Sequence, residues 1–184
     1  MKILLLRHEK RGIDLSFFSE LTKNGLLDAE NKVKNELLNH DIDYIFSSPF
    51  TRTLQTIYPY CINVNKKVNI EYGLYEYMNN PIFLIGNWLY YTNDLKYDNL
   101  KNIINNKYKS KVKENSIVVL ENEESLSNRI TVFFNYLKKN KKYKNKTILI
   151  VSHMAIINKI KDLYLKKTSL NDLFEMGNIE ILEI

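Results

Sequence analysis

Two short apolar segments near opposite ends of the chain each lead into a histidine. Ile3–Leu6 precedes Arg7-His8, and Ile148–Val151 precedes His153 after one intervening serine. Wholly apolar runs of this length are typical of parallel strands that are buried on both faces. Ligands bind at the carboxyl ends of such strands in open α/β sheets. One sheet can therefore bring both histidines into a common crevice, although a single histidine beside a strand is more often structural.

A third segment adds a cation to the same crevice. Tyr44–Phe46 has the composition of a strand, and we expect Ser48 and Pro49 to be the cap and first residue of the helix that follows. Arg52 then falls in the first helical turn, where a cation opposes the helix dipole. This placement is reasonable if a phosphate occupies the helix N-terminus and Arg52 binds it. The alternative is an arginine that extends away into solvent.

Strands and helices alternate along the rest of the chain, which favours a three-layer α/β/α sandwich with a mostly parallel central sheet. We expect one domain over residues 1–184, with an irregular, cap-like excursion at about 72–115 that contains about two short helices. Its aromatic residues, among them Trp88, Tyr90 and Tyr91, either roof the crevice or form a small satellite core. The other expected elements are a helix from the cap Thr22 to about Asn39 that buries Leu26, Leu27, Ala29, Val33, Leu37 and Leu38, a strand at Val68–Ile70, an extended segment at Ile117–Leu120, helices at Glu124–Lys139 and after His153, and an edge or antiparallel strand at Ile179–Ile184.

Composition narrows the functional classes. The net charge of +6 comes from lysines scattered along the chain, which indicates a solvated surface or a weak general attraction for anions. No nucleic-acid-reading motif accompanies it, so we expect no nucleic-acid partner. Cys61 is the only cysteine, which excludes an internal disulfide. No stretch approaches the ~18 apolar residues needed to cross a bilayer. We therefore expect a cytoplasmic protein with no membrane partner.

Several motifs together resemble the histidine phosphatase superfamily, whose members include the phosphoglycerate mutase-like proteins. LLLRHEKR is similar to its arginine-histidine signature, and SSPFTRTLQT closely resembles its Ser-Ser-Pro-x-x-Arg-x-x-Gln-Thr motif. LTKNG resembles its Leu-Thr-x-x-Gly helix start, and VSHM its second-histidine motif. Leu74-Tyr75-Glu76 is similar to the Leu-x-Glu of the proton donor, and Glu124-Ser125 with Arg129 to a late Glu-Ser-x-x-x-Arg helix.

The resemblance implies a chemistry for each matching residue. His8 would be the nucleophile and form a phosphohistidine, with its tautomer fixed by a hydrogen bond from the other ring nitrogen to the backbone. Arg7, Arg52 and His153 would bind the phosphoryl oxygens, so that no metal or other cofactor is needed. Glu76 would protonate the leaving oxygen and then assist water. We expect nearby tyrosines to raise the pKa of Glu76 by desolvation; the alternative is an ordinary exposed carboxylate.

The chain departs from the family pattern at three positions. Glu9 stands where the family usually has glycine, so its carboxylate either repels phosphate or points outward and pairs with Lys10 or Arg11. Met154 replaces a smaller residue after the second histidine and narrows the pocket. Asp28 replaces a glutamine that is common in the first helix.

Three functions fit these patterns. The first is a metal-independent phosphatase of small phosphomonoesters that works through His8. The second is a phosphoglycerate-type mutase, which this short chain fits less well because mutases of the family usually carry a longer closing insertion. The third is a catalytically idle phospholigand-binding module, for which Glu9 is the main argument. The identity of the substrate and the oligomeric state cannot be derived from the sequence.

Overall fold

A computed structural model describes the chain except for residues 15, 82–94, 96–97, 167–171 and 184. Its sheet has five strands in the order β3-β2-β4-β1-β5, where β1 is Lys2–Arg7, β2 Tyr44–Ser47, β3 Val68–Ile70, β4 Thr147–Ser152 and β5 Ile179–Glu183. The strands β1 to β4 pair in parallel, whereas β5 runs antiparallel at the edge beside β1. The mostly parallel sheet and the antiparallel tail are both confirmed.

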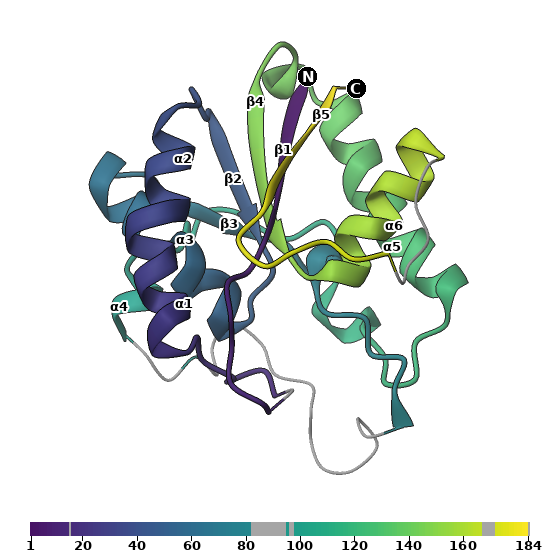
Figure 1. The fold of residues 1–184 in the computed structure, drawn as a ribbon. Helices are drawn as coiled ribbons and strands as arrows, with labels where there is room; N and C mark the ends of the chain where they lie inside the picture. Colours follow the sequence, from purple (N-terminus) through teal and green to yellow (C-terminus); the bar gives the residue numbers. More distant parts are fainter. Residues whose placement is uncertain (15, 82–94, 96–97, 167–171, 184) are drawn as a thin grey trace.

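Helices cover both faces of this sheet and give the expected three layers (Figure 1). Side chains alternate along β1, so that Leu4 and Leu6 pack on one face and Ile3 and Leu5 on the other. All four are fully buried. One face is covered by α1 (Lys23–Asp28), a π-helical segment (Ala29–Val33), α2 (Lys34–Leu38) and α3 (Thr51–Val64); the other is covered by α5 (Glu123–Lys139) and α6 (Met154–Leu165).

The first helical segment corrects part of the predicted core. Thr22 is the N-cap, as expected, and its hydroxyl accepts a hydrogen bond from Gly25 N. The buried stripe is Gly25, Ala29, Val33 and Leu37, one residue in every four. The π-helical turn widens the period, and a four-residue spacing then stays on one face. Three leucines that were expected in the core instead lie at the surface, 44–59% exposed: Leu26, Leu27 and Leu38.

The start of α3 also differs from the prediction. Ser48 and Pro49 lie before the helix, which begins at Thr51 with Phe50 in the N-cap position. Phe50 makes no side-chain capping hydrogen bond, but Thr51 N donates to Phe17 O at 3.2 Å. The Ser48 side chain is thereby free of a capping role and faces the interior, where it is fully buried.

The excursion after β3 is held together by one buried carboxylate. It contains a 3-10 turn (Tyr72–Leu74), the short helix α4 (Asp98–Lys101) and a second 3-10 turn (Glu114–Ser116). The extended segment expected at Ile117–Leu120 is confirmed for the backbone of Ile117, but residues 119–120 form a turn and the segment joins no strand. Trp88, Tyr90 and Tyr91 lie outside the described residues. The carboxylate of Glu71 is fully buried and accepts hydrogen bonds from Gly73 N, Tyr108 Oη, Ser110 Oγ, Lys111 N and Val112 N.

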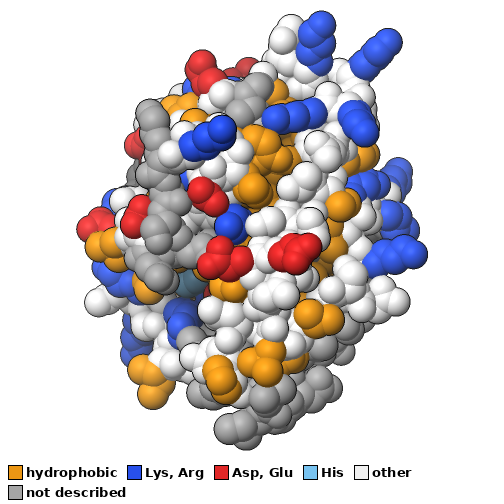
Figure 2. Space-filling model, turned by 90° about the vertical axis from the view of Figure 1, so that its right-hand side faces the viewer, with side chains coloured by type: hydrophobic (Ala, Val, Ile, Leu, Met, Phe, Trp, Pro, Cys, Tyr) orange, Lys and Arg blue, Asp and Glu red, His pale blue; other side chains and the backbone are white. Residues whose placement is uncertain are grey.

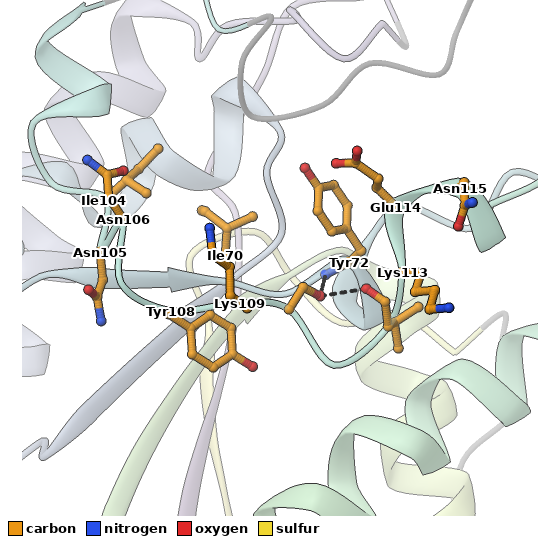
Figure 3. Close-up of a pocket in the computed structure, with 12 residues that line it drawn as sticks. Ile70, Tyr72, Ile104, Asn105, Asn106, Tyr108, Lys109, Lys113, Glu114 and Asn115 are labelled. Carbon is orange, nitrogen blue, oxygen red and sulfur yellow. Dashed lines mark hydrogen bonds between the residues drawn. The ribbon is translucent and has the colours of Figure 1, made fainter.

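A cleft of about 500 Å³ lies between β3 and this excursion (Figure 3). Tyr72, Lys113 and Glu114 line one side, and Ile104 and Asn105 the other. Ser110 also lines the cleft, and its hydroxyl accepts a hydrogen bond from Tyr72 N at 2.9 Å. Neither of the two strand-end histidines is in its lining, so this cleft is separate from the predicted site. Among the helices of the described part of the chain, none is both long and apolar enough to span a membrane.

Candidate active site

The sheet brings the two strand-end histidines together. β1 and β4 pair in parallel with Arg7 opposite Ser152, and His8 N donates to Ser152 O at 3.1 Å. His8 and His153 therefore leave the sheet side by side, with ring centroids 5.3 Å apart. Both rings are almost completely buried, at 2% and 1% exposure. The predicted convergence at the carboxyl edge of the sheet is what the structure shows.

His8 is held as a neutral imidazole with one free nitrogen. Its Nδ1 lies 2.8 Å from the backbone oxygen of Glu9. A carbonyl can only accept, so Nδ1 carries the proton and the lone pair is on Nε2. Burial, followed by the nearby charge of Arg52, lowers the pKa of His8 well below its usual value. The ring is thus unprotonated at neutral pH, as a nucleophile must be.

His153 is hydrogen-bonded through one ring nitrogen and lies close to a carboxylate through the other. Nε2 lies 2.9 Å from Ser48 Oγ, whereas Nδ1 lies 3.1 Å from Glu76 Oε2 without the geometry of a hydrogen bond. The charge of the carboxylate favours a proton on Nδ1, and the Ser48 hydroxyl then donates to Nε2. Burial lowers the pKa of His153 to about 4 despite the carboxylate beside it. Ser48 therefore belongs to the site and sets the tautomer of His153.

Arg52 projects into the site and is not a surface arginine. Its side chain is 1% exposed, and its guanidinium lies 4.3 Å from the centroid of the Phe50 ring. Nη1 donates to Ser16 O and Nη2 to Glu76 Oε2, both at 3.0 Å. Burial lowers the pKa of Arg52 to about 10, which leaves it cationic at neutral pH. Its Nε has no hydrogen-bond partner within the described residues.

The side chain of Glu76 is half-buried beside the two histidines, but its pKa shifts in the direction opposite to the prediction. Burial by itself would raise its pKa; however, His153 and then Arg52 oppose burial and hold the pKa of Glu76 below its usual range. The expected rise through nearby tyrosines is therefore wrong for the free protein. Glu76 is therefore ionised in the free protein, and its carboxylate lies within about 3 Å of Arg52 and His153, which are expected to bind phosphate.

Arg7 is positioned by a segment distant in sequence. Its Nη1 donates to Phe174 O, its backbone N donates to Asn178 O, and its backbone O accepts from Gly177 N. No partner is found within the described residues for its buried Nε. Burial lowers the pKa of Arg7, and the charge of Glu76 partly opposes this. The guanidinium is thus held at the strand end with donor capacity to spare.

A pocket of about 350 Å³ opens beside these side chains, and Arg7, His8 and Glu76 are the ones among them that line it. Figure 2 faces the α5 and α6 side and shows acidic and basic side chains close together, with a histidine visible between them. The volume suits a small molecule. The pocket is lined by Arg7, His8, Arg11, Glu76, Tyr77, Asn79, Glu123, Met154 and Ala155.

Glu9 points away from this pocket. Its side chain is 1% exposed, and Oε2 accepts a hydrogen bond from Lys10 N at 3.2 Å. It packs against Gly177, where a Cβ would lie 1.8 Å from Oε1. Neither alternative considered from the sequence is correct: Glu9 does not face the phosphate position, and it is buried without an ion pair to Lys10 or Arg11. Its presence leaves the pocket open.

The remaining motif residues hold the strand-end loops in place. Thr56 Oγ1 accepts from Glu9 N at 2.9 Å, and Gln55 Oε1 accepts from Leu21 N at 2.8 Å. Gly25 allows the helix start to approach the loop, since a Cβ there would lie 2.2 Å from Lys10 O. These motif residues therefore position the loops that carry the two histidines.

One buried ion pair near the site was missed from the sequence. Arg129 forms two hydrogen bonds with Glu121, at 2.6 and 2.8 Å, and it also donates to Gly73 O and Glu76 O. It therefore fixes the backbone that carries Glu76. The motif around Arg129 gives no indication of its partner. Glu121 lies in an irregular segment before α5, where no sequence pattern predicts a buried carboxylate.

The charges around the pocket favour an anion. One ring nitrogen of His8, one of His153 and a carboxylate oxygen of Glu76 lie within 4.8 Å of one another, a spacing that suits one phosphoryl group or one metal ion. Arg52 lies 3.0 Å from that same carboxylate, and its charge repels a cation. A phosphoryl group at this position would instead lie near two guanidiniums, two imidazoles and one carboxylate.

Fold and site together define an α/β protein with two histidines, two arginines and a carboxylate gathered at the carboxyl edge of its sheet. The chain belongs to the histidine phosphatase superfamily (branch 1), whose family model matches residues 18–184. The matched range begins after Arg7 and His8, which the structure places beside the matched histidine, His153. A comparison with curated protein sequences finds no match.

Solved structures with this fold include several phosphatases. A putative alpha-ribazole-5'-P phosphatase from Escherichia coli superposes with a TM-score of 0.67 at 19% identity, covering 100% of this chain and 91% of that chain. An ecdysone phosphate phosphatase from Bombyx mori in complex with tungstate has a TM-score of 0.66 at 13% identity, with coverage of 98% and 87%. A phosphoserine phosphatase from Entamoeba histolytica in complex with 3-phosphoglyceric acid has a TM-score of 0.63 at 23% identity, with coverage of 98% and 89%.

Proposed function

We propose that this protein is a phosphatase that hydrolyses small phosphomonoesters through a phosphohistidine on His8, without a metal ion. The observation that carries the proposal is the state of His8: the ring is neutral, Nδ1 is hydrogen-bonded to a backbone oxygen, and Nε2 has no hydrogen-bond partner in the described part of the chain. The centroid of this ring lies 5.3 Å from that of His153. Membership of the superfamily and the phosphatases that share the fold support it.

In the first step, Nε2 of His8 attacks phosphorus, the N–P bond forms and the ester P–O bond breaks. Arg7, Arg52 and His153 stabilise the charge that spreads over the three equatorial oxygens. The Nε atoms of both arginines, which have no hydrogen-bond partner among the residues that the structure describes, offer donors for this purpose. The alcohol oxygen leaves with a proton from Glu76.

Glu76 acquires that proton because the substrate changes its surroundings. In the free protein its carboxylate is paired with Arg52 and His153. A phosphate dianion takes over these partners and adds negative charge beside the carboxylate, and both effects raise the pKa of Glu76. The group then becomes protonated as substrate binds and can act as the acid. In the second step Glu76, once more a carboxylate, removes a proton from the water that attacks the phosphohistidine, and inorganic phosphate is released.

The test is hydrolysis of an aryl phosphate between pH 4 and 8 by the native protein and two histidine variants. His8→Ala should abolish turnover, whereas His40→Ala should not, because His40 lies at the end of the first helical segment and faces Glu36. Radiolabelled substrate quenched in base should leave label on the native chain and not on His8→Ala, and acid should release it. An inactive native protein that binds phosphate would favour the idle binding module.

The mutase alternative is tested in the same series. Incubation with 3-phosphoglycerate and a bisphosphorylated primer should yield inorganic phosphate if water accepts the phosphoryl group. Formation of the 2-phospho isomer without phosphate release would favour the mutase.

A further inference from the structure

The excess positive charge of this chain is concentrated in one segment. Residues 138–146 contain six lysines and no acidic residue, and the remaining 21 basic residues of the chain are matched by its 21 acidic ones. Lysines occur along the whole chain, but the net charge of +6 therefore arises between the last turn of α5 and the start of β4. These six residues form the lysine patch: Lys138, Lys139, Lys141, Lys142, Lys144 and Lys146.

The fold places the lysine patch at the end of the molecule opposite the active site. α5 ends at Lys139 and β4 begins at Thr147, so the patch lies at the amino edge of the sheet, where both termini also lie (Figure 1). β4 is six residues long and leads to His153, so at ~3.3 Å per residue about 20 Å separate the patch from the active site. A partner that covers the patch therefore leaves the pocket open.

Most of the charge in the patch is not compensated within the described residues. Lys146 forms an ion pair with Asp43 at 2.8 Å, and Asp41 and Glu183 also lie near its ammonium group. The other five lysines are exposed and form no ion pair in the part of the chain that the structure describes. In Figure 2, where this end of the molecule is uppermost, basic side chains without acidic ones among them lie at the upper right.

Aromatic rings hold two of these lysines in place. Lys142 Nζ lies 4.6 Å from the centroid of the Tyr143 ring and 5.6 Å from that of Tyr44. Lys138 Nζ lies 4.4 Å from the centroid of the Tyr164 ring. Such contacts orient an ammonium group without neutralising it. The patch is therefore a partly ordered positive surface.

Two features of the patch favour a membrane surface over a nucleic acid. It contains lysine only, which acts as a hydrated point charge, whereas arginine is the residue typical of bidentate recognition of phosphates and bases. The ring of Tyr143 is fully buried and those of Tyr44 and Tyr164 lie beneath lysines, so the patch offers charge and not stacking platforms for bases. Clusters of about four to eight basic residues are typical of proteins that bind anionic lipid headgroups.

We propose that the lysine patch binds the surface of membranes that contain anionic phospholipids, and that it holds the protein there with the active site facing the solution. The interaction is electrostatic and does not depend on the proposed function. The expectation of no membrane partner rested on the lack of an apolar segment long enough to cross a bilayer, which binding at the surface does not require.

Sedimentation with lipid vesicles tests this proposal. Phosphatidylcholine vesicles with about 30% phosphatidylserine should bind the native protein at low salt and release it at high salt, whereas pure phosphatidylcholine vesicles should not bind it. Each lysine near an anionic surface strengthens binding about fivefold, so a triple variant should bind about a hundredfold more weakly. This variant combines Lys139→Gln, Lys141→Gln and Lys144→Gln, whose side chains are exposed.

A second triple variant is the matched control. It removes the same number of charges from exposed lysines of α1, the π-helical segment and α4, all outside the patch. The substitutions are Lys23→Gln, Lys32→Gln and Lys101→Gln. This control should bind the phosphatidylserine vesicles as the native protein does, and both variants should keep the native midpoint in urea denaturation.

Each other outcome would overturn the inference. The native protein would fail to sediment with phosphatidylserine vesicles if the patch were only a solvated surface. An equal loss of binding in the two triple variants would show an effect of net charge alone. Displacement of the native protein from the vesicles by duplex DNA at an equal concentration of phosphate groups would assign the patch to nucleic acid. None of these results is read from catalysis, so failure of the proposed phosphatase activity would leave them unchanged.

Discussion

The carboxylate of Glu9 occupies the space beside the Cα of Gly177, so replacing Gly177 by alanine should create a steric clash between the two residues. A Cβ at Gly177 would lie 1.8 Å from Glu9 Oε1 and 2.6 Å from its carboxyl carbon. Gly177 also has a φ of +73°, a conformation that costs an alanine roughly 1–2 kcal/mol. Glu9 is 1% exposed, and displacing a packed side chain typically costs about 1–3 kcal/mol. Gly177→Ala should therefore destabilise the protein by about 2–5 kcal/mol.

A double-mutant cycle isolates the steric part of this cost. In a Glu9→Ala background the overlap disappears and only the backbone cost of about 1–2 kcal/mol remains. The coupling free energy between the two positions should therefore be about 1–3 kcal/mol. Urea denaturation followed by circular dichroism measures each variant, and Glu9→Gln, which keeps the shape of the side chain, should not relieve Gly177→Ala.

The same cycle has a kinetic readout. Gly177 N donates to Arg7 O, and the segment from Phe174 to Asn178 also binds the Arg7 backbone and guanidinium. Displacing it should weaken phosphate binding, so inhibition by inorganic phosphate should weaken in Gly177→Ala and recover with Glu9→Ala. If Gly177→Ala costs the same free energy in both backgrounds, the steric reasoning is wrong.

Three further predictions concern side chains around the pocket. Ser48→Ala leaves a buried nitrogen of His153 without its donor, so we expect about 1–3 kcal/mol less stability by urea denaturation and a lower kcat in the aryl phosphate assay. The pKa of His153 is lowered to about 4 in the folded state, so the unfolded chain takes up the proton at a higher pH than the folded protein does. The free energy of unfolding should therefore fall by up to roughly 3 kcal/mol as the pH drops from about 6.5 to 4. Urea denaturation across this range should show a shallower fall in His153→Asn. Arg129→Met leaves Glu121 buried and unpaired at a cost of about 3–5 kcal/mol, and adding Glu121→Gln should recover part of it in the same denaturation assay.

The convergence of the histidines was predictable because it follows from local patterns. A run of apolar residues fixes a buried parallel strand, and the residue after such a strand lies at the carboxyl edge of the sheet whatever the rest of the chain does. His8 and His153 needed no other information. The predictions for Thr22 and for the alternating tail also rest on local patterns, since a helix cap and a two-residue period are each defined by a few consecutive residues.

The predictions that failed depended on contacts between distant segments. Serine is a residue type that commonly caps helices, but the hydroxyl of Ser48 instead bonds to His153, because the buried ring nitrogen of His153 requires a hydrogen-bond partner. The neighbours of Glu76 in sequence are tyrosines, which suggest desolvation; its neighbours in space are Arg52 and His153, which outweigh it. Glu9 could not be placed because Gly177 is far away in the chain.

The contacts of Arg7 with the segment around Phe174 and Gly177 have a consequence for how the molecule acquires activity. The guanidinium is oriented only after a loop of more than one hundred and fifty residues has closed, because its partners lie at positions 174–178. Closure of so long a loop belongs to the late, slow part of folding. During refolding from urea, helical ellipticity should therefore return before phosphate binding does.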